Sequence, residues 1–384
     1  MVHTSRKEMW IFWNSMNNSD EAFFALVKAG LWEKTVRISM LKKIDFNEVY
    51  RHAEEQSLIG LVTAGMEHVV DVKVPQELVL KFVGTALQLE QQNSLMNEFI
   101  ADIVEKMREA GIYTLLVKGQ GVAQCYERPQ WRFCGDVDYY LNHDNYEKAK
   151  VLLIPLAKSI KPEGVYQKHL NMTIDSWVVE LHGSMRCGLS KRMDKVIDEI
   201  HHDIFHDGHV RSWQNGQTQV FLPSADNDVM IVFTHYLKHF FKGGIGLRQI
   251  CDWCRLLWTY HDSINYKLLK KRLDSAGLMS EWKAFGGFAV EYLGMPQEVM
   301  PLYSDGGRWK RKAKKIMYLS LKSAGTERRD KSFFDKYPYV IRKAFSFGRR
   351  CVDLYRAAKV FPMDSLRFFP SIVFRGLKSA ARGE

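Results

Sequence analysis

The sequence predicts an α+β fold. A small mixed β-sheet with flanking helices, at about residues 94–185, lies between an N-terminal helical segment and a large helical C-terminal region. Apolar residues have helical spacing before residue 112, β-branched runs occur between residues 113 and 182, and helical spacing returns after residue 223. The 384 residues exceed what one core usually spans. We therefore divide the chain into residues 1–93, 94–222 and 223–384.

The first hundred residues predict helices. The segment IDFNEVYRHAEEQSLIGLVTAGMEHV has helical spacing, and Asp45 is a candidate for its N-cap. A second helix is predicted from about Ser94, again as N-cap, to Gly111. Its apolar face comprises Leu95, Met96, Phe99, Ile100, Ile103, Val104 and Met107.

A strand is predicted over residues 113–117, where the run is short, apolar and β-branched. It ends in the turn Lys118-Gly119-Gln120-Gly121, which a short helix over residues 122–126 and a loop over 127–133 follow. The segment DVDYYL, residues 136–141, predicts a second strand. Because side chains alternate along a strand, Asp136 and Asp138 share one face.

Beyond this strand we expect a helix over residues 143–156, then two strands over residues 165–182 with a turn near Asp175-Ser176. In the second of these strands Val178, Glu180 and His182 share a face. From Pro223 onward the pattern predicts helices over residues 226–241 and 247–260, separated by the turn KGGIG, and further helices to about Leu377.

The carboxylates of the predicted strands suit a metal site. Mg²⁺ prefers hard oxygen ligands, and Asp136, Asp138 and a third carboxylate from Glu180 would provide them. The turn before them places backbone N–H groups at a helix start, where phosphate oxygens bind, and Lys118 adds charge there. Taken singly, an Asp-x-Asp pair is also typical of a solvated strand edge, and Lys-Gly of an ordinary turn. Their order and spacing favour the metal site.

The run LLVKGQGVAQCYERPQWRFCGDVDYYL resembles the core motif of an uncharacterised bacterial nucleotidyltransferase family, near the abortive-infection toxin nucleotidyltransferases. Members of that family have a leucine-rich strand, Lys-Gly, an aromatic residue, Arg and then Gly-Asp-x-Asp. The segments VVELHG and HYLKHFFKGGIGLRQICDWCRLL are similar to two further pieces of it. The resemblance spans roughly Asp45 to Leu257.

This resemblance implies a polymerase-β-like core with Asp136, Asp138 and Glu180 as catalytic metal ligands and Gly119 at the phosphates. It implies a Mg²⁺-dependent enzyme with two ions, or Mn²⁺ in their place, that moves an NMP from ATP or another NTP to a hydroxyl or phosphate acceptor and releases pyrophosphate. The acceptor is left open among RNA, a protein, a sugar phosphate and a small molecule. The wider superfamily has a Ser after the glycine, where this chain has Gln120.

Further candidates surround this motif. Arg132 either contacts phosphate or holds Asp136 in place, and His182 is either an acceptor-positioning residue or a structural histidine. His235, Lys238 and His239 share a helical face and could point at the triphosphate or the acceptor. They predict a polar pocket wall rather than a zinc site, because no acidic ligand accompanies them. Lys242 and Arg248 could neutralise phosphate, although Arg248 and Asp252 at i, i+4 could simply pair with each other. Cys251 and Cys254 predict buried core thiols.

Charge is concentrated at the C-terminus. Residues 301–384 carry 21 Lys and Arg against 7 Asp and Glu, a net of +14, which leaves −3 for residues 1–300. This asymmetry predicts either an anionic partner or a solvated basic helical face. The second hypothesis for function is therefore a non-catalytic scaffold that binds RNA or a membrane-associated assembly through this region.

The scattered cysteines and the lack of a secretory start in Met1–Phe24 predict a cytoplasmic protein, and no apolar run approaches the ~18 residues of a transmembrane segment.

Overall fold

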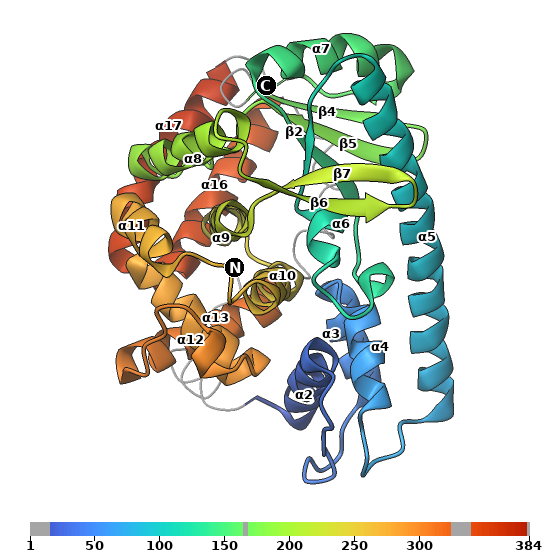
Figure 1. The fold of residues 1–384 in the computed structure, drawn as a ribbon. Helices are drawn as coiled ribbons and strands as arrows, with labels where there is room; N and C mark the ends of the chain where they lie inside the picture. Colours follow the sequence, from blue (N-terminus) through green and yellow to red (C-terminus); the bar gives the residue numbers. More distant parts are fainter. Residues whose placement is uncertain (1–15, 164–167, 324–338, 382–384) are drawn as a thin grey trace.

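The computed structural model describes residues 16–163, 168–323 and 339–381 (Figure 1). It confirms the predicted α+β class. Five strands form one sheet in the order β1 (Leu115–Val117), β2 (Asp136–Tyr140), β5 (Trp177–His182), β4 (His169–Ile174) and β3 (Ala157–Ile160). The sheet is mixed because β2 and β5 are parallel, whereas the other neighbouring pairs are antiparallel.

The two faces of this sheet differ in polarity. Val137 and Leu181 point to one face and pack with Ile103 of α5 (Gln76–Glu109) and Leu153 of α7 (His143–Leu153). Figure 1 shows both helices lying over this part of the sheet. The alternate positions of β2, β5 and β4 carry Asp, Glu, His and Asn. Because the apolar face is covered, this polar face is left to form the wall of a cavity.

A second sheet consists of the hairpin β6 (Val210–Asn215) and β7 (Thr218–Pro223). Leu222 of β7 belongs to the same core as the apolar face of the main sheet. Neither this hairpin nor β3 was predicted. The short helix α6 (Gly119–Ala123) begins directly at the glycine, three residues before the predicted helix start.

The N-terminal segment is helical, as predicted, and contains α2 (Asn18–Trp32), α3 (Phe46–Glu55) and α4 (Ile59–Glu67). Asp45 caps α3 by accepting hydrogen bonds from the N–H groups of its first turn. The single helix predicted here is two helices, because Ser57 between them has a positive φ of 56°. The prediction that a helix starts at Ser94 was wrong, since α5 is continuous from Gln76 and Leu95 on its predicted apolar face is 51% exposed.

The C-terminal region is helical, as predicted, from α9 (Ala225–Lys242) and α10 (Leu247–Thr259) onward. The other helices after β5 are α8 (Lys191–Phe205), α11 (Tyr266–Ala276), α12 (Met279–Leu293), α13 (Gly307–Ser323), α16 (Tyr339–Ala358) and α17 (Pro362–Ala381). Their core includes the fully buried Trp253 and Trp282. No helix within the described ranges is long and apolar enough to cross a membrane.

The predicted division into three parts stays a prediction, and its first boundary, between residues 93 and 94, lies inside α5. Parts of three other predictions lie outside the described residues. These parts are residues 1–15 of the secretory-start prediction, residues 165–167 at the start of the predicted hairpin, and residues 324–338 and 382–384 of the basic region.

Candidate active site

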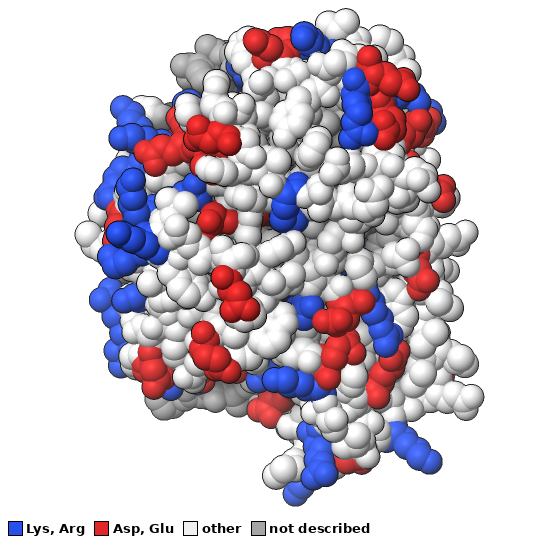
Figure 2. Space-filling view, in the orientation of Figure 1, with Lys and Arg blue, Asp and Glu red and all other residues white. Residues whose placement is uncertain are grey.

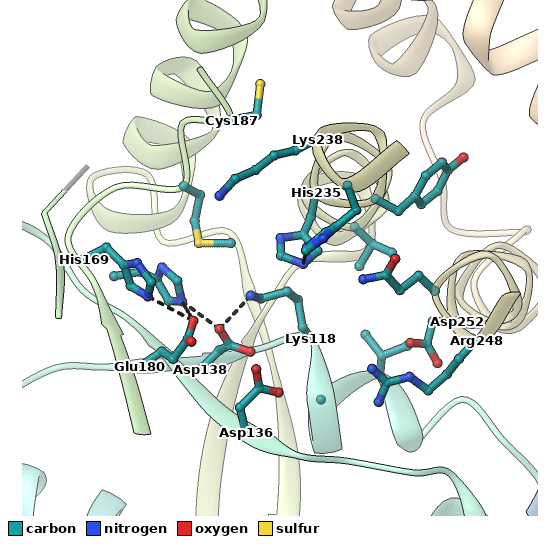
Figure 3. Close-up of a pocket in the computed structure, with 18 of the residues that line it drawn as sticks. Lys118, Asp136, Asp138, His169, Glu180, Cys187, His235, Lys238, Arg248 and Asp252 are labelled. Carbon is teal, nitrogen blue, oxygen red and sulfur yellow. Dashed lines mark hydrogen bonds and ion pairs between the residues drawn. The ribbon is translucent and has the colours of Figure 1, made fainter. Parts of the chain in front are cut away.

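Three carboxylates meet on the polar face of the sheet. Asp136 and Asp138 lie on β2, and the parallel register with β5 places Glu180 directly beside Asp138. One oxygen of each carboxylate lies within 4.8 Å of the others. Figure 3 shows the three side chains pointing into the same space. The sequence-predicted metal ligands are therefore brought together.

Lys118 contacts this group from the end of β1. Its Nζ lies 2.6 Å from Oδ1 of Asp138. Its backbone has φ 58° and ψ −144°, a region that side-chain-bearing residues rarely adopt, and such strain is concentrated at functional sites. Burial alone would lower the pKa of Lys118, but the charges of Asp138 and Asp136 raise that pKa above its ordinary value.

Asp136 and Asp138 differ in their surroundings. Asp138 also accepts a hydrogen bond from Nε2 of His182 at 2.6 Å. Burial opposes its ionisation, yet Lys118 and His182 hold the pKa of Asp138 below its ordinary value. Burial, followed by the charge of Asp138, raises the pKa of Asp136. Within the described residues the Asp136 carboxylate accepts no hydrogen bond, and this excess of negative charge fits a divalent cation.

Glu180 is held by two partners on β4. His169 Nε2 lies 2.9 Å from Oε2, and Asn171 Nδ2 donates to Oε1 at 2.8 Å. Burial opposes ionisation of Glu180, but the hydrogen bonds of His169 and His182 lower its pKa far below the usual value. Glu180 is therefore a fixed anion.

The opposite wall of the cavity is formed by α9 and α10. His235, Lys238 and His239 line it, as the helical spacing predicted, and Arg248 lines it from α10. Burial lowers the pKa of all three α9 side chains, that of His239 to about 4, because the cations of Lys238 and Lys118 add to the effect. The two imidazoles are thus neutral near pH 7 and touch through Nε2 at 3.1 Å. This wall therefore presents two cationic groups, the ammonium of Lys238 and the guanidinium of Arg248, and two neutral imidazole rings to an anion in the cavity.

Several predicted residues lie elsewhere or have other partners. Lys242 does not line the cavity, and its Nζ donates to the carbonyl of Cys187 at 3.3 Å. Gln120 is buried behind the turn, where its Nε2 donates to Oδ1 of Asn93 at 2.8 Å, so its side chain does not face the cavity. Gly119 does line it. A Cβ on Gly119 would lie 3.1 Å from Sγ of Cys134.

Arg132 pairs with Asp252 rather than with Asp136, because its buried guanidinium faces α10. Its Nε and Nη2 lie 3.1 Å and 2.6 Å from the two carboxylate oxygens of Asp252. Of the two alternatives for Arg248, the structure does not show the pairing with Asp252, since Nη1 of Arg248 donates to the carbonyl of Phe133 at 2.6 Å.

The thiols of Cys251 and Cys254 are fully buried in the core, as predicted. Sequence reasoning missed His169 and Arg186, which both line the cavity. His169 could have been found from the predicted turn at Asp175-Ser176, because antiparallel pairing of the strands on either side of that turn places His169 opposite His182. No comparable pattern indicated Arg186, which follows β5 in a loop.

The cavity between the two walls has a volume of about 390 Å³. This lies within the usual range for small-molecule sites. Anionic carboxylates line one side of the cavity and cationic groups line the other. This arrangement suits a ligand with phosphate groups, because the cationic side can contact the phosphates directly and the carboxylates can contact them through a divalent metal.

A family model described as an uncharacterised nucleotidyltransferase matches residues 42–294, which is most of the chain and includes every residue that lines the cavity. No curated protein and no solved structure matches the chain. Bacterial origin and the nearness to abortive-infection toxins stay predictions.

Proposed function

The chain belongs to the uncharacterised nucleotidyltransferase family, and from this premise we propose that it moves an NMP from an NTP to an acceptor hydroxyl or phosphate and releases pyrophosphate. The observation that supports the proposal best is the convergence of Asp136, Asp138 and Glu180 within 4.8 Å, opposite a cationic wall. Members of this family are expected to use divalent metals, and three carboxylates provide the ligands that Mg²⁺ prefers.

The three carboxylates would hold Mg²⁺, which when bound neutralises triphosphate charge and lowers the pKa of the attacking hydroxyl. Lys118 lines the cavity next to Asp138, and its ammonium group would contact the triphosphate there. Lys238 and Arg248 face the phosphates from the other wall.

Asp136 is our candidate for the proton acceptor. Its carboxylate faces the cavity, accepts no hydrogen bond within the described residues and has a raised pKa. Glu180, by contrast, has both oxygens engaged by β4 side chains. In the proposed reaction the acceptor proton moves to Asp136, the acceptor oxygen bonds the α-phosphorus, and the bond to the β-phosphate breaks so that pyrophosphate leaves.

Asp136→Asn tests this proposal. It preserves side-chain volume but removes the metal ligand and the proton acceptor, so Mg²⁺-dependent NTP consumption should fall by at least about 10²-fold. The assay incubates the protein with each labelled NTP and cell extract, and asks which fraction takes up label. Asp262→Asn is the control, because the Asp262 side chain is 93% exposed and is not among the residues that line the cavity. Full activity of Asp136→Asn would reject the proposed site.

A second candidate function rests on the basic region. On α16, Phe345, Phe347 and Tyr355 are 52%, 44% and 65% exposed, and Arg349 is exposed among them. Such aromatic and basic side chains can stack on RNA bases or lie on an anionic membrane. Figure 2 shows further Lys and Arg along the edge of the molecule beside α11.

Deleting residues 301–384 is not a clean test of this alternative, because Phe361 and Phe368 are fully buried in the core. Tyr355→Ala together with Arg349→Glu leaves that core intact. A scaffold should show salt-dependent RNA or vesicle binding that this double variant weakens, and calorimetry should detect no Mg²⁺-dependent NTP binding.

A further inference from the structure

Two histidines of the cavity wall lie side by side across neighbouring strands. The antiparallel register of β4 and β5 pairs His169 with His182, and their rings stack with centroids 4.6 Å apart and planes 5° apart. Figure 3 shows the His169 side chain next to Glu180. His169 Nε2 lies 2.9 Å from Oε2 of Glu180, and His182 Nε2 lies 3.5 Å from the same oxygen.

These distances match those between ligands of one metal ion. Two atoms that each bind a tetrahedral Zn²⁺ at about 2.1 Å lie about 3.4 Å apart, and at right angles about 3.0 Å apart. The ligand atoms of His169, Glu180 and His182 all lie within 4.8 Å of one another. For both Nε2 atoms to bind one ion, the parallel rings would tilt toward each other, and the protons that these nitrogens now share with Asp138 and Glu180 would be released, as metal binding requires.

We propose that His169, His182 and Glu180 form a binding site for a first-row transition-metal dication of the Zn²⁺ and Co²⁺ class, beside the all-oxygen site of Asp136 and Asp138. Imidazole nitrogen favours these ions over Mg²⁺, whereas carboxylate-only sites favour Mg²⁺. The two sites share Glu180. In this respect the inference deepens the proposed function, because it gives the metal centre two unlike positions.

The composition of the cluster distinguishes it from the other candidates. Among the groups of metal-ligating side chains in the described ranges, it alone contains two imidazoles. The group of Asp203, Asp207 and His209 offers one imidazole and is largely exposed. His169 keeps a side-chain exposure of 31% and lines the cavity, so an ion can reach it.

The test is a titration of the purified full-length protein with Co²⁺, followed by the visible absorption of the bound ion, with no nucleotide present. We expect one Co²⁺ site whose spectrum indicates nitrogen ligation and which Zn²⁺ displaces, whereas an excess of Mg²⁺ does not. His169→Gln should weaken Co²⁺ binding by about 10- to 100-fold or more, because even partners of metal ligands contribute that much.

The choice of glutamine separates ligation from support. The side-chain amide that His169→Gln introduces can still donate to Glu180, so a purely structural role of the histidine would leave Co²⁺ affinity unchanged. His209→Gln is the matched control, because it removes an imidazole from the exposed cluster and should leave the Co²⁺ spectrum as it is. Asp136→Asn should also retain it.

Two results would overturn the proposal. One is Co²⁺ affinity that His169→Gln leaves unchanged, and the other is a Co²⁺ spectrum that His209→Gln abolishes. Either result leaves the proposed function standing if Mg²⁺ supports NTP consumption. Conversely, Co²⁺ bound through His169 without any NTP consumption would support the metal site and count against nucleotidyl transfer.

Discussion

The buried pair of Arg132 and Asp252 makes a strong prediction about stability. The side chains are 6% and 7% exposed, and the guanidinium contacts both carboxylate oxygens. The same carboxylate accepts a hydrogen bond from the hydroxyl of Tyr126 at 2.9 Å. The pair joins the loop before β2 to α10, which means that it links the two walls of the cavity.

Asp252→Ala removes the acceptor for both partners. Breaking a buried pair from one side costs about 3–5 kcal/mol, because the remaining charge stays buried without compensation. The Tyr126 hydroxyl loses its partner as well, which adds roughly 1 kcal/mol. Nη1 of Arg132 already has no hydrogen bond among the described residues, so the arginine has no second anchor. We therefore expect a loss of about 4–6 kcal/mol in the free energy of unfolding.

Urea unfolding, followed by circular dichroism, measures this loss. Asp198→Ala is the matched control, because Asp198 forms an equally bidentate pair with Arg186, at 2.6 Å for both contacts, on the surface. The control should lose no more than about 1 kcal/mol. Arg132→Met with Asp252→Leu should recover most of the stability, since it removes both charges. Equal losses for Asp252→Ala and Asp198→Ala would refute the reasoning.

Two further predictions concern packing and pH. In Gly121→Ala the new Cβ would lie 2.9 Å from Cδ2 of Leu222, so overpacking should cost about 1–3 kcal/mol in urea unfolding; an unchanged midpoint would contradict this contact. Burial, and then Asp364, raises the pKa of Glu281 to about 8. The folded state therefore keeps this proton to higher pH than the unfolded state, whose ordinary value is 4.5. The resulting stability is complete below pH 4.5 and is lost as the pH rises through 8. Glu281→Gln should thus be more stable than the parent at about pH 9, by a few kcal/mol, and similar at about pH 5. The same difference at both pH values would show that Glu281 is not the titrating group.

The carboxylate cluster could be predicted because it depends on local rules. Alternation along a strand places Asp136 and Asp138 on one face, and the turn after β4 fixes which face of β5 carries Glu180. What alternation cannot supply is the parallel pairing of β2 with β5, since a helix and two further strands separate them along the chain. The resemblance implied only that Glu180 joins the two aspartates, and the structure gives the parallel pairing itself.

The start of α5 could not be read from its own sequence. The polar run Gln91-Gln92-Asn93 before Ser94 is typical of a linker followed by a helix cap. In the structure Asn93 lies fully buried inside the helix, where its Nδ2 donates to the carbonyls of Gln130 and Arg132. Asn93 is therefore polar because it makes a tertiary contact, which no local sequence pattern predicts, and the helix α5 continues past this residue.

Asn93 also explains the structural role of Gln120. Its Nε2 donates to Oδ1 of Asn93, so the side chain joins the turn to α5 on the side away from the cavity. The wider superfamily has a serine at this position. Here the cavity side of the turn is formed instead by Gly119 and by Lys118, whose strained backbone directs its ammonium group to Asp138. Gln120 is therefore not among the residues that line the cavity, and its side chain has a structural partner instead.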